Sequence, residues 1–195
     1  MARQPSQPFR ILIIAGEASG DLHGGGLVAA FKARHPDVMF QGVGGGHMRA
    51  AGVDILQDID ELGAIGAFEL IGSLGRHLRI LWDLRTRIRN GDYQAAILIN
   101  YPAFNLLVSR VCQRHGCPVH FYIGPQVWAS RPGRIDTLRR TVKKMYVVFP
   151  FEEEIYQEAG VPVAYLGHPF VDLVRARQPR QATLDRFGLD PGIPT

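Results

Sequence analysis

The chain has 195 residues, of which 46% are hydrophobic and 21% are charged, and its formal net charge is +4. These values are those of an ordinary globular protein, and no apolar run approaches the roughly 18 residues of a membrane span. The two cysteines, Cys112 and Cys117, match no zinc or redox motif. Because the N-terminus also lacks the apolar core of a signal peptide, we expect a cytoplasmic protein.

Strand-like and helix-like segments alternate along the chain. In order, the pattern predicts a strand at residues 9–16, a helix at 21–36, strands at 38–45 and 53–57, a helix at 67–89, a strand at 95–100, a helix at 104–115, a strand at 118–124, a helix at 133–141, a strand at 144–150, a helix at 151–159 and a strand at 163–169. Repeated β-α units predict an α/β domain with a doubly wound, mostly parallel sheet and helices on both faces. Residues 176–195 then resemble a linker that contains one short helix ending at Gly188.

Ligands of such sheets usually bind where the parallel strands end, so the loops after the strands are the candidate site. The first loop, AGEASGDLHGGG (15–26), has neither the G-x-G-x-x-G spacing nor a P-loop. Its two carboxylates, Glu17 and Asp21, suit the hydroxyl and amide groups of a sugar better than a diphosphate. Asp21 is predicted either to cap the following helix or to bind a ligand. Glu17 has no evident capping role, which favours a role in the site.

The predicted strand at residues 95–100 ends on Asn100. An amide can orient a hydroxyl group by hydrogen bonding, but its oxygen is too weakly basic to accept the proton. We therefore predict that Asn100 positions a substrate without deprotonating it. The consecutive glycines of GVGGGHMRAAG (42–52) predict a close approach of this backbone to other backbone or to a ligand.

The loop YIGPQVWASRPGRID (122–136) follows another predicted strand and is stiffened by two prolines. Gln126, Trp128, Arg131 and Arg134 form a polar and aromatic set that suits a sugar face and a phosphate. A place in the core is the alternative for Trp128, whereas the two arginines favour contact with an anion.

The segment FELIGSLGRHLRILWDLRTRIRN (68–90) combines a broad apolar face with five arginines and one aspartate. A helix that packs on the core would show the same apolar stripe, so both a core role and a membrane role are open. The arginine density and Trp82 favour a helix that lies on an anionic membrane surface. The predicted membrane contacts are Phe68, Ile71, Arg76, Arg79 and Trp82.

Six motifs, in their order and spacing, make the chain similar to the lipid-A-disaccharide synthase family. They are GEASGD (16–21), GVGGGHM (42–48), INYPAFN (99–105), GPQVWA (124–129) with Arg131 and Arg134, FPFEEEIY (149–156) and LGHPFVD (166–172). The resemblance implies the Rossmann-like N-terminal domain of a GT-B glycosyltransferase in residues 1–175. Residues 176–195 would then lead toward a C-terminal nucleotide-sugar domain.

The resemblance also implies an inverting reaction that needs no metal and no cofactor. UDP-2,3-diacylglucosamine and 2,3-diacylglucosamine 1-phosphate would give the lipid A disaccharide 1-phosphate and UDP, at the inner face of the inner membrane. No nucleic acid is expected as a partner, and a homodimer remains open. The implied substrate-binding residues are Gly16, Ser19, Gly20, Asp21, Asn105, Gln126, Trp128, Arg131, Arg134, Glu152 and His168. For Glu152 a helix N-terminal role is the alternative, and for His168 a structural role.

The chain departs from the family pattern at Asn100, where the family has the aspartate that is its favoured general base. Three explanations follow. Glu17 supplies the base, or the enzyme is slow, or the protein is a catalytically impaired paralogue that acts as a lipid-binding, sugar-binding or membrane-surface module. The first gives the predicted catalytic pair, Asn100 and Glu17.

Overall fold

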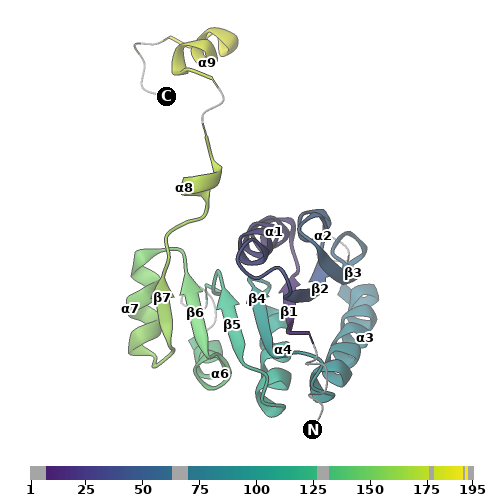
Figure 1. Cartoon of the computed structure of the whole chain (residues 1–195). Coiled ribbons are helices and arrows are strands. Elements are labelled where there is room, and N and C mark those ends of the chain that lie inside the picture. Colours follow the sequence, from purple (N-terminus) through teal and green to yellow (C-terminus); the bar gives the residue numbers. More distant parts are fainter. Residues whose placement is uncertain (1–7, 63–69, 127–131, 176–177, 191, 193–195) are drawn as a thin grey trace.

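The structure, a computed structural model, describes residues 8–62, 70–126, 132–175, 178–190 and 192. Seven strands form one sheet in the order β3-β2-β1-β4-β5-β6-β7, and every neighbouring pair is parallel (Figure 1). The strands are β1 (Arg10–Ala15), β2 (Met39–Gly44), β3 (Val53–Asp58), β4 (Ala95–Ile99), β5 (Val119–Tyr122), β6 (Lys144–Val147) and β7 (Val163–Tyr165). The predicted doubly wound parallel sheet is confirmed.

The helices that connect these strands are α1 (Ala18–Lys32), α2 (Gly46–Ala50), α3 (Leu70–Arg89), α4 (Pro102–Arg114), α6 (Ile135–Thr141) and α7 (Pro150–Glu158). Short 3-10 turns cover Asp60–Leu62 and Pro132–Arg134. Helix α2 was not predicted, because its five residues follow a run of glycines that reads locally as a loop. The sequence therefore located every strand but missed two short helices, α2 next to the candidate site and the four-residue helix Phe170–Leu173.

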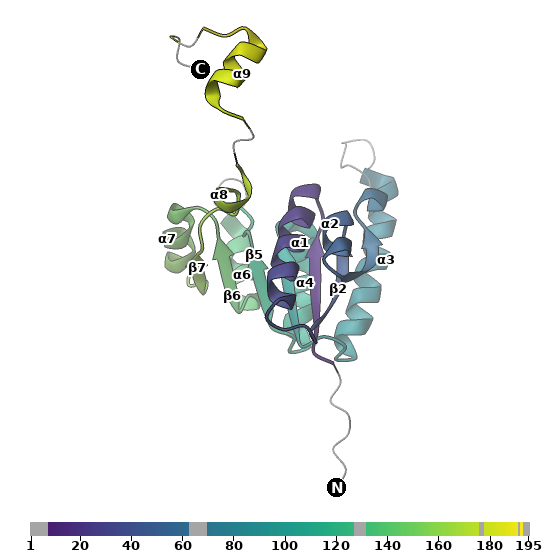
Figure 2. The ribbon, with the colours of Figure 1, turned by 45° about the horizontal axis from the view of Figure 1, so that its top comes forward.

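Side chains of β1 alternate between two separate hydrophobic cores, as the pleat of a strand requires. Ile11 and Ile13 pack with Val28 of α1 and Met48 of α2. The intervening side chains of β1 face the opposite core, which contains buried residues of α3, α4, α6 and α7. Figure 2 shows α1 and α4 on opposite sides of the sheet. Both faces of the sheet are thus buried, which explains the near-continuous apolar runs of the central strands.

One part of the sheet face is left partly open. On the α1 side, the side chains of Ile97, His120, Tyr122 and Tyr146 are only partly buried. They line a hollow of about 440 Å³ between α1 and strands β4 to β7. His120 and Tyr146 stack there with ring centroids 6.0 Å apart, and burial followed by the charge of Lys143 lowers the pKa of His120.

The last two helices continue away from the sheet. Helix α8 (Phe170–Leu173) follows β7, and α9 (Arg180–Phe187) lies apart from the sheet in Figure 1. Helix α9 ends at Gly188, whose φ of 61° is the left-handed conformation that glycine adopts without strain. The prediction of one helix ending at Gly188 is confirmed.

Candidate functional site

The carboxyl ends of β1 and β4 bring Glu17 and Asn100 together. Ala15 pairs with Ile99 in the sheet register, so the residues that follow the two strands leave the same edge side by side. The Nδ2 atom of Asn100 lies 3.5 Å from Oε2 of Glu17, which is a long hydrogen bond. Glu17 occupies the N-cap position of α1, but its side chain makes no capping bond. This exposed carboxylate therefore has oxygen lone pairs left for a ligand hydroxyl.

Asn100 and Tyr101 turn the chain sharply from β4 into α4. Their φ angles of 42° and 50° are left-handed, a conformation that asparagine adopts more readily than most non-glycine residues and that a bulky tyrosine adopts rarely. Asn105, which is fully buried, donates from Nδ2 to the carbonyls of Ile99 (3.2 Å) and Asn100 (2.8 Å). Each such residue costs about 1–3 kcal/mol of strain, so a conformation of this kind persists only where its surroundings enforce it. Asn105 thus holds the turn that directs Asn100 toward Glu17.

Tyr101 closes the other side of this turn. A Cβ atom on Gly16 would overlap the ring of Tyr101, so only glycine lets the two strand exits approach this closely. The Tyr101 hydroxyl is hydrogen-bonded to Nε2 of His77 on α3. Burial and, to a smaller extent, Glu17 raise the pKa of Tyr101. Sequence reasoning missed this pair, because only the fold brings His77 to the end of β4.

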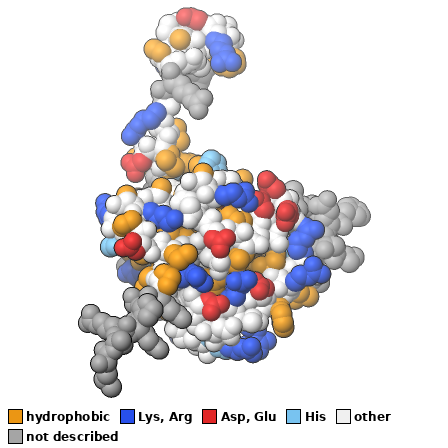
Figure 3. Space-filling view, turned by 45° about the vertical axis from the view of Figure 1, so that its right-hand side comes forward, with side chains coloured by type: hydrophobic (Ala, Val, Ile, Leu, Met, Phe, Trp, Pro, Cys, Tyr) orange, Lys and Arg blue, Asp and Glu red, His pale blue; other side chains and the backbone are white. Residues whose placement is uncertain are grey.

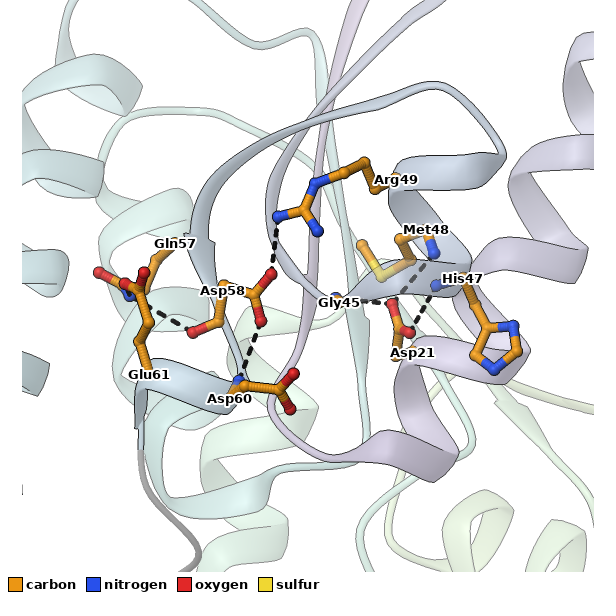
Figure 4. A network of polar contacts seen from close by, with 9 residues as sticks. All are labelled: Asp21, Gly45, His47, Met48, Arg49, Gln57, Asp58, Asp60 and Glu61. Carbon is orange, nitrogen blue, oxygen red and sulfur yellow. Dashed lines mark hydrogen bonds and ion pairs between the residues drawn. The ribbon is translucent and has the colours of Figure 1, made fainter.

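Asp21 holds the N-terminus of α2 (Figure 4). Its carboxylate accepts hydrogen bonds from the backbone N–H groups of Gly45 (2.7 Å), His47 (2.9 Å) and Met48 (3.0 Å). The prediction that Asp21 caps its own helix is wrong. Helix α1 begins at Ala18, and Asp21 lies in its first turn, from which it caps a different helix. Because Asp21 is only 3% exposed, we infer that it shapes the glycine loop rather than contacting a ligand.

Glycines let α1 approach its neighbours. A Cβ on Gly20 would lie 3.2 Å from that of Ala15, and a Cβ on Gly24 would lie 2.8 Å from the sulfur of Met48. The predicted close approach at the 42–52 loop is also found, since a Cβ on Gly45 would lie 3.0 Å from Oδ2 of Asp21. Ser19 is exposed in the first turn of α1, next to Glu17.

The loop after β5 is only partly within the described residues. Gln126 is exposed, and Arg134 is half-buried in the 3-10 turn that leads into α6. Trp128 and Arg131 lie outside the described residues. The start of the loop is fixed from below, because the Tyr156 hydroxyl donates to the carbonyl of Pro125. The loop therefore leaves β5 at the same sheet edge as Glu17 and Asn100, beside β4.

Glu152 has the helix N-terminal role that the sequence left open as an alternative. It is 2% exposed, and its Oε2 accepts a hydrogen bond from the backbone N–H of Phe149 (3.3 Å), as in a capping box. His168 lies between β7 and α8, with its ring centroid 4.9 Å from that of Phe170 and its Nδ1 accepting from the Phe170 N–H at 3.2 Å. Phe170 also contacts His23 of α1 at 5.2 Å. These contacts tie the start of α8 to α1.

The helix expected to contact a membrane faces in two directions. Leu84 and Ile88 of α3 are buried in the core, and Leu81 packs against it. The side of α3 that carries these residues therefore packs on the core, which is one of the two roles that the sequence left open. Arg76 and Arg79 are exposed, and Trp82 is 70% exposed. Leu81 is partly buried and Trp82 is exposed, yet both side chains line the surface between α3 and α4. Phe68 and the side chain of Ile71 lie outside the described part.

No helix within the described residues is both long and apolar enough to cross a bilayer. Nor do three or more histidine, cysteine or acidic side chains converge there in a way that could hold a metal ion.

Comparisons with known proteins cover almost the whole chain. Curated relatives named lipid-A-disaccharide synthase are 49% identical in Geobacter sulfurreducens, over 94% of this chain, and 43% identical in Syntrophus aciditrophicus, over 95%. Each alignment takes in 48% of the relative, so the chain spans about half the length of these proteins. The crystal structure of Acinetobacter baumannii MurG has a similar fold, with a TM-score of 0.51 and 12% identity over 87% of this chain and 47% of that chain.

A family model described as lipid-A-disaccharide synthetase matches residues 11–194. The match takes in both strand exits that form the Glu17–Asn100 pair and the loop after β5. The chain therefore belongs to the lipid-A-disaccharide synthetase family.

Proposed function

We propose that this chain is the acceptor-binding, Rossmann-like half of a GT-B lipid-A-disaccharide synthase. In that reaction UDP-2,3-diacylglucosamine and 2,3-diacylglucosamine 1-phosphate give the lipid A disaccharide 1-phosphate and UDP with inversion. The observation that supports the proposal best is the exposed carboxylate of Glu17 beside Asn100 at the edge where parallel strands end. Residues 1–175 would form this domain and residues 176–195 the linker toward a nucleotide-sugar domain.

The Glu17–Asn100 pair suits one in-line displacement. Glu17 accepts the proton of the acceptor hydroxyl while that oxygen forms a bond to the anomeric carbon of the donor. The bond from the anomeric carbon to the UDP oxygen breaks, and UDP leaves with its electron pair. Asn100 cannot take the proton, but its amide holds the carboxylate or the hydroxyl in line. Such a positioned base typically contributes roughly 10²–10⁴-fold to the rate.

The donor and acceptor lipids would reach the site from a membrane. We therefore place the protein at the inner face of the inner membrane as a peripheral protein, with Arg76, Arg79 and Trp82 of α3 among its contacts. Their exposure supports this placement.

Two assays test the proposal. The first measures binding of 2,3-diacylglucosamine 1-phosphate to the 195-residue chain. The second measures UDP release by a chimera that joins this chain to the remaining half of the Geobacter sulfurreducens relative. We expect Glu17→Gln to lower transfer by roughly 10²–10⁴-fold, whereas the control Glu158→Gln, at the far end of α7, leaves it unchanged.

Asn100→Asp separates the remaining explanations. It should lower transfer, because a second carboxylate 3.5 Å from Glu17 disfavours the ionised base. A large gain instead would show that the base was missing, and would overturn the role of Glu17. A chimera that binds the acceptor but transfers nothing, with or without Asn100→Asp, would support the alternative function, a non-catalytic lipid- or sugar-binding module.

A further inference from the structure

Three helices on one face of the sheet form a strongly cationic layer. Helices α3 and α4 are in contact, as are α4 and α6, and all three bury side chains in the same core. Together their sequences hold nine arginines, two aspartates and no lysine. The whole chain has a net charge of only +4, so this layer is more positive than the entire protein. Figure 3 turns toward the viewer the side of the molecule on which α3 lies in Figure 1, and there basic side chains stand among acidic and hydrophobic ones.

A groove of about 490 Å³ runs between α3 and α4 within this layer. Its apolar lining is Leu78, Leu81, Trp82, Leu107 and Val111, and its polar lining is Arg85, Arg110, Arg114 and His115. Trp82, Leu78 and Leu107 are 70%, 56% and 42% exposed, and because they line the same groove they form one contiguous apolar surface. No carboxylate is among the described residues that line the groove.

The guanidinium groups of the groove are available to a ligand. In the part of the chain that the structure describes, Arg85, Arg110 and Arg114 take part in no ion pair. Arg110 donates one hydrogen bond to Thr137 (2.9 Å), which orients it and leaves further N–H groups. Guanidinium forks match phosphate oxygens in pairs. A set of such groups around an apolar slot complements a ligand with an anionic head and an apolar tail.

We propose that the α3–α4 groove binds the phosphate headgroup and the adjoining acyl segment of an anionic phospholipid at a bilayer surface. This inference rests on the proposed function only in that lipid substrates require a membrane. Apart from Trp82, the apolar walls are aliphatic (Leu78, Leu81, Leu107 and Val111), so they offer a single large ring for base stacking, which disfavours a nucleic acid. A second copy that docked through the same groove would set two cationic layers against each other.

The position of the groove links the lipid to the candidate site. Helix α4 begins at Pro102, directly after the Asn100–Tyr101 turn, and α3 carries His77, which holds Tyr101. A lipid in the groove would thus sit on the two helices that support this turn.

The test measures partitioning of the 195-residue chain onto phosphatidylcholine vesicles with and without phosphatidylglycerol. We expect binding only with the anionic lipid. Arg85→Gln/Arg114→Gln should lower the partition coefficient about thirtyfold, because each basic residue near such a surface contributes roughly fivefold. The matched control Arg34→Gln/Arg180→Gln removes two exposed charges outside the groove. Its partition coefficient should stay within about threefold of that of the parent chain. Equal losses in the two double variants would overturn a defined site.

A second variant tests the groove itself. Leu107→Gln lies on the α4 wall and leaves the charge unchanged, and we expect about tenfold weaker partitioning from the lost apolar burial. If α3 is attracted to the vesicle surface only diffusely, Leu107→Gln should have the same partition coefficient as the parent chain. That result would refute lipid binding in the groove. Urea midpoints of all variants must match the parent, so that unfolding does not explain a loss.

Other occupants give distinct results. If soluble glycerol 3-phosphate displaces the chain from vesicles while Leu107→Gln leaves vesicle binding unchanged, the groove is an anion site and not a lipid site. Saturable binding of an oligonucleotide, or dimerisation that Leu107→Gln abolishes, without vesicle binding would also refute the proposal. No sugar substrate is present, so failure here leaves the transferase proposal standing. Conversely, if the chimera is inactive on substrates dispersed in detergent, the transferase proposal fails. The lipid-groove proposal is unaffected, because that assay contains no bilayer.

Discussion

Asp21→Asn tests the inference that Asp21 shapes the glycine loop. In the structure one carboxylate oxygen accepts from Gly45 and Met48 and the other accepts from His47. An asparagine keeps only one acceptor oxygen, so its NH₂ group would point at an N–H donor. The substitution also removes the negative charge from the N-terminus of α2, where it is favourable.

The cost follows from these contacts. One charge-assisted hydrogen bond is lost, two become neutral, and a buried N–H is left without an acceptor, which together amount to about 3 kcal/mol. Urea unfolding of the 195-residue chain measures this loss directly. The exposed Asp37→Asn is the matched control and should change the free energy of unfolding by less than about 0.5 kcal/mol.

The competing interpretation makes the opposite prediction. If Asp21 binds the acceptor directly, Asp21→Asn weakens acceptor binding while its stability stays near that of Asp37→Asn. A destabilisation within about 0.5 kcal/mol of the control would therefore refute the structural role.

Three further predictions follow from the same region. Gly24→Ala should destabilise the chain by about 1–3 kcal/mol in urea unfolding, because its Cβ would lie 2.8 Å from Met48, whereas the exposed helical control Gly26→Ala should stabilise it by up to about 1 kcal/mol. Asn105→Ala should cost about 2 kcal/mol and weaken acceptor binding measured by calorimetry, because it frees the turn at Asn100; unchanged acceptor affinity would contradict this. Burial, then His168, lowers the pKa of His23, so the unfolded chain binds the extra proton first and stability should fall as pH drops below about 6.5. Urea midpoints of His23→Gln should show a weaker pH dependence in that range.

The sequence was sufficient for features that depend on local pattern. Short apolar runs bounded by glycine, proline or polar residues located all seven strands, and the central ones are nearly continuous because a strand buried on both faces must be apolar. The same runs identified Glu17 and Asn100 as residues at strand exits, and parallel strands place their exits at one edge. The six motifs were enough to identify the family, which the match over residues 11–194 confirms.

Only the tertiary structure decided which side chains meet. Asp21 caps a helix more than 20 residues away rather than its own, and His77 reaches Tyr101 from another helix. The arginine density of residues 68–90 was visible in the sequence, but the extent of the cationic layer was not, because α4 and α6 add four more arginines that only the fold brings beside α3. Periodicity indicates which face of a helix or strand is buried. The partner of a polar side chain depends instead on how elements far apart in the sequence pack together, and only the whole fold determines that packing.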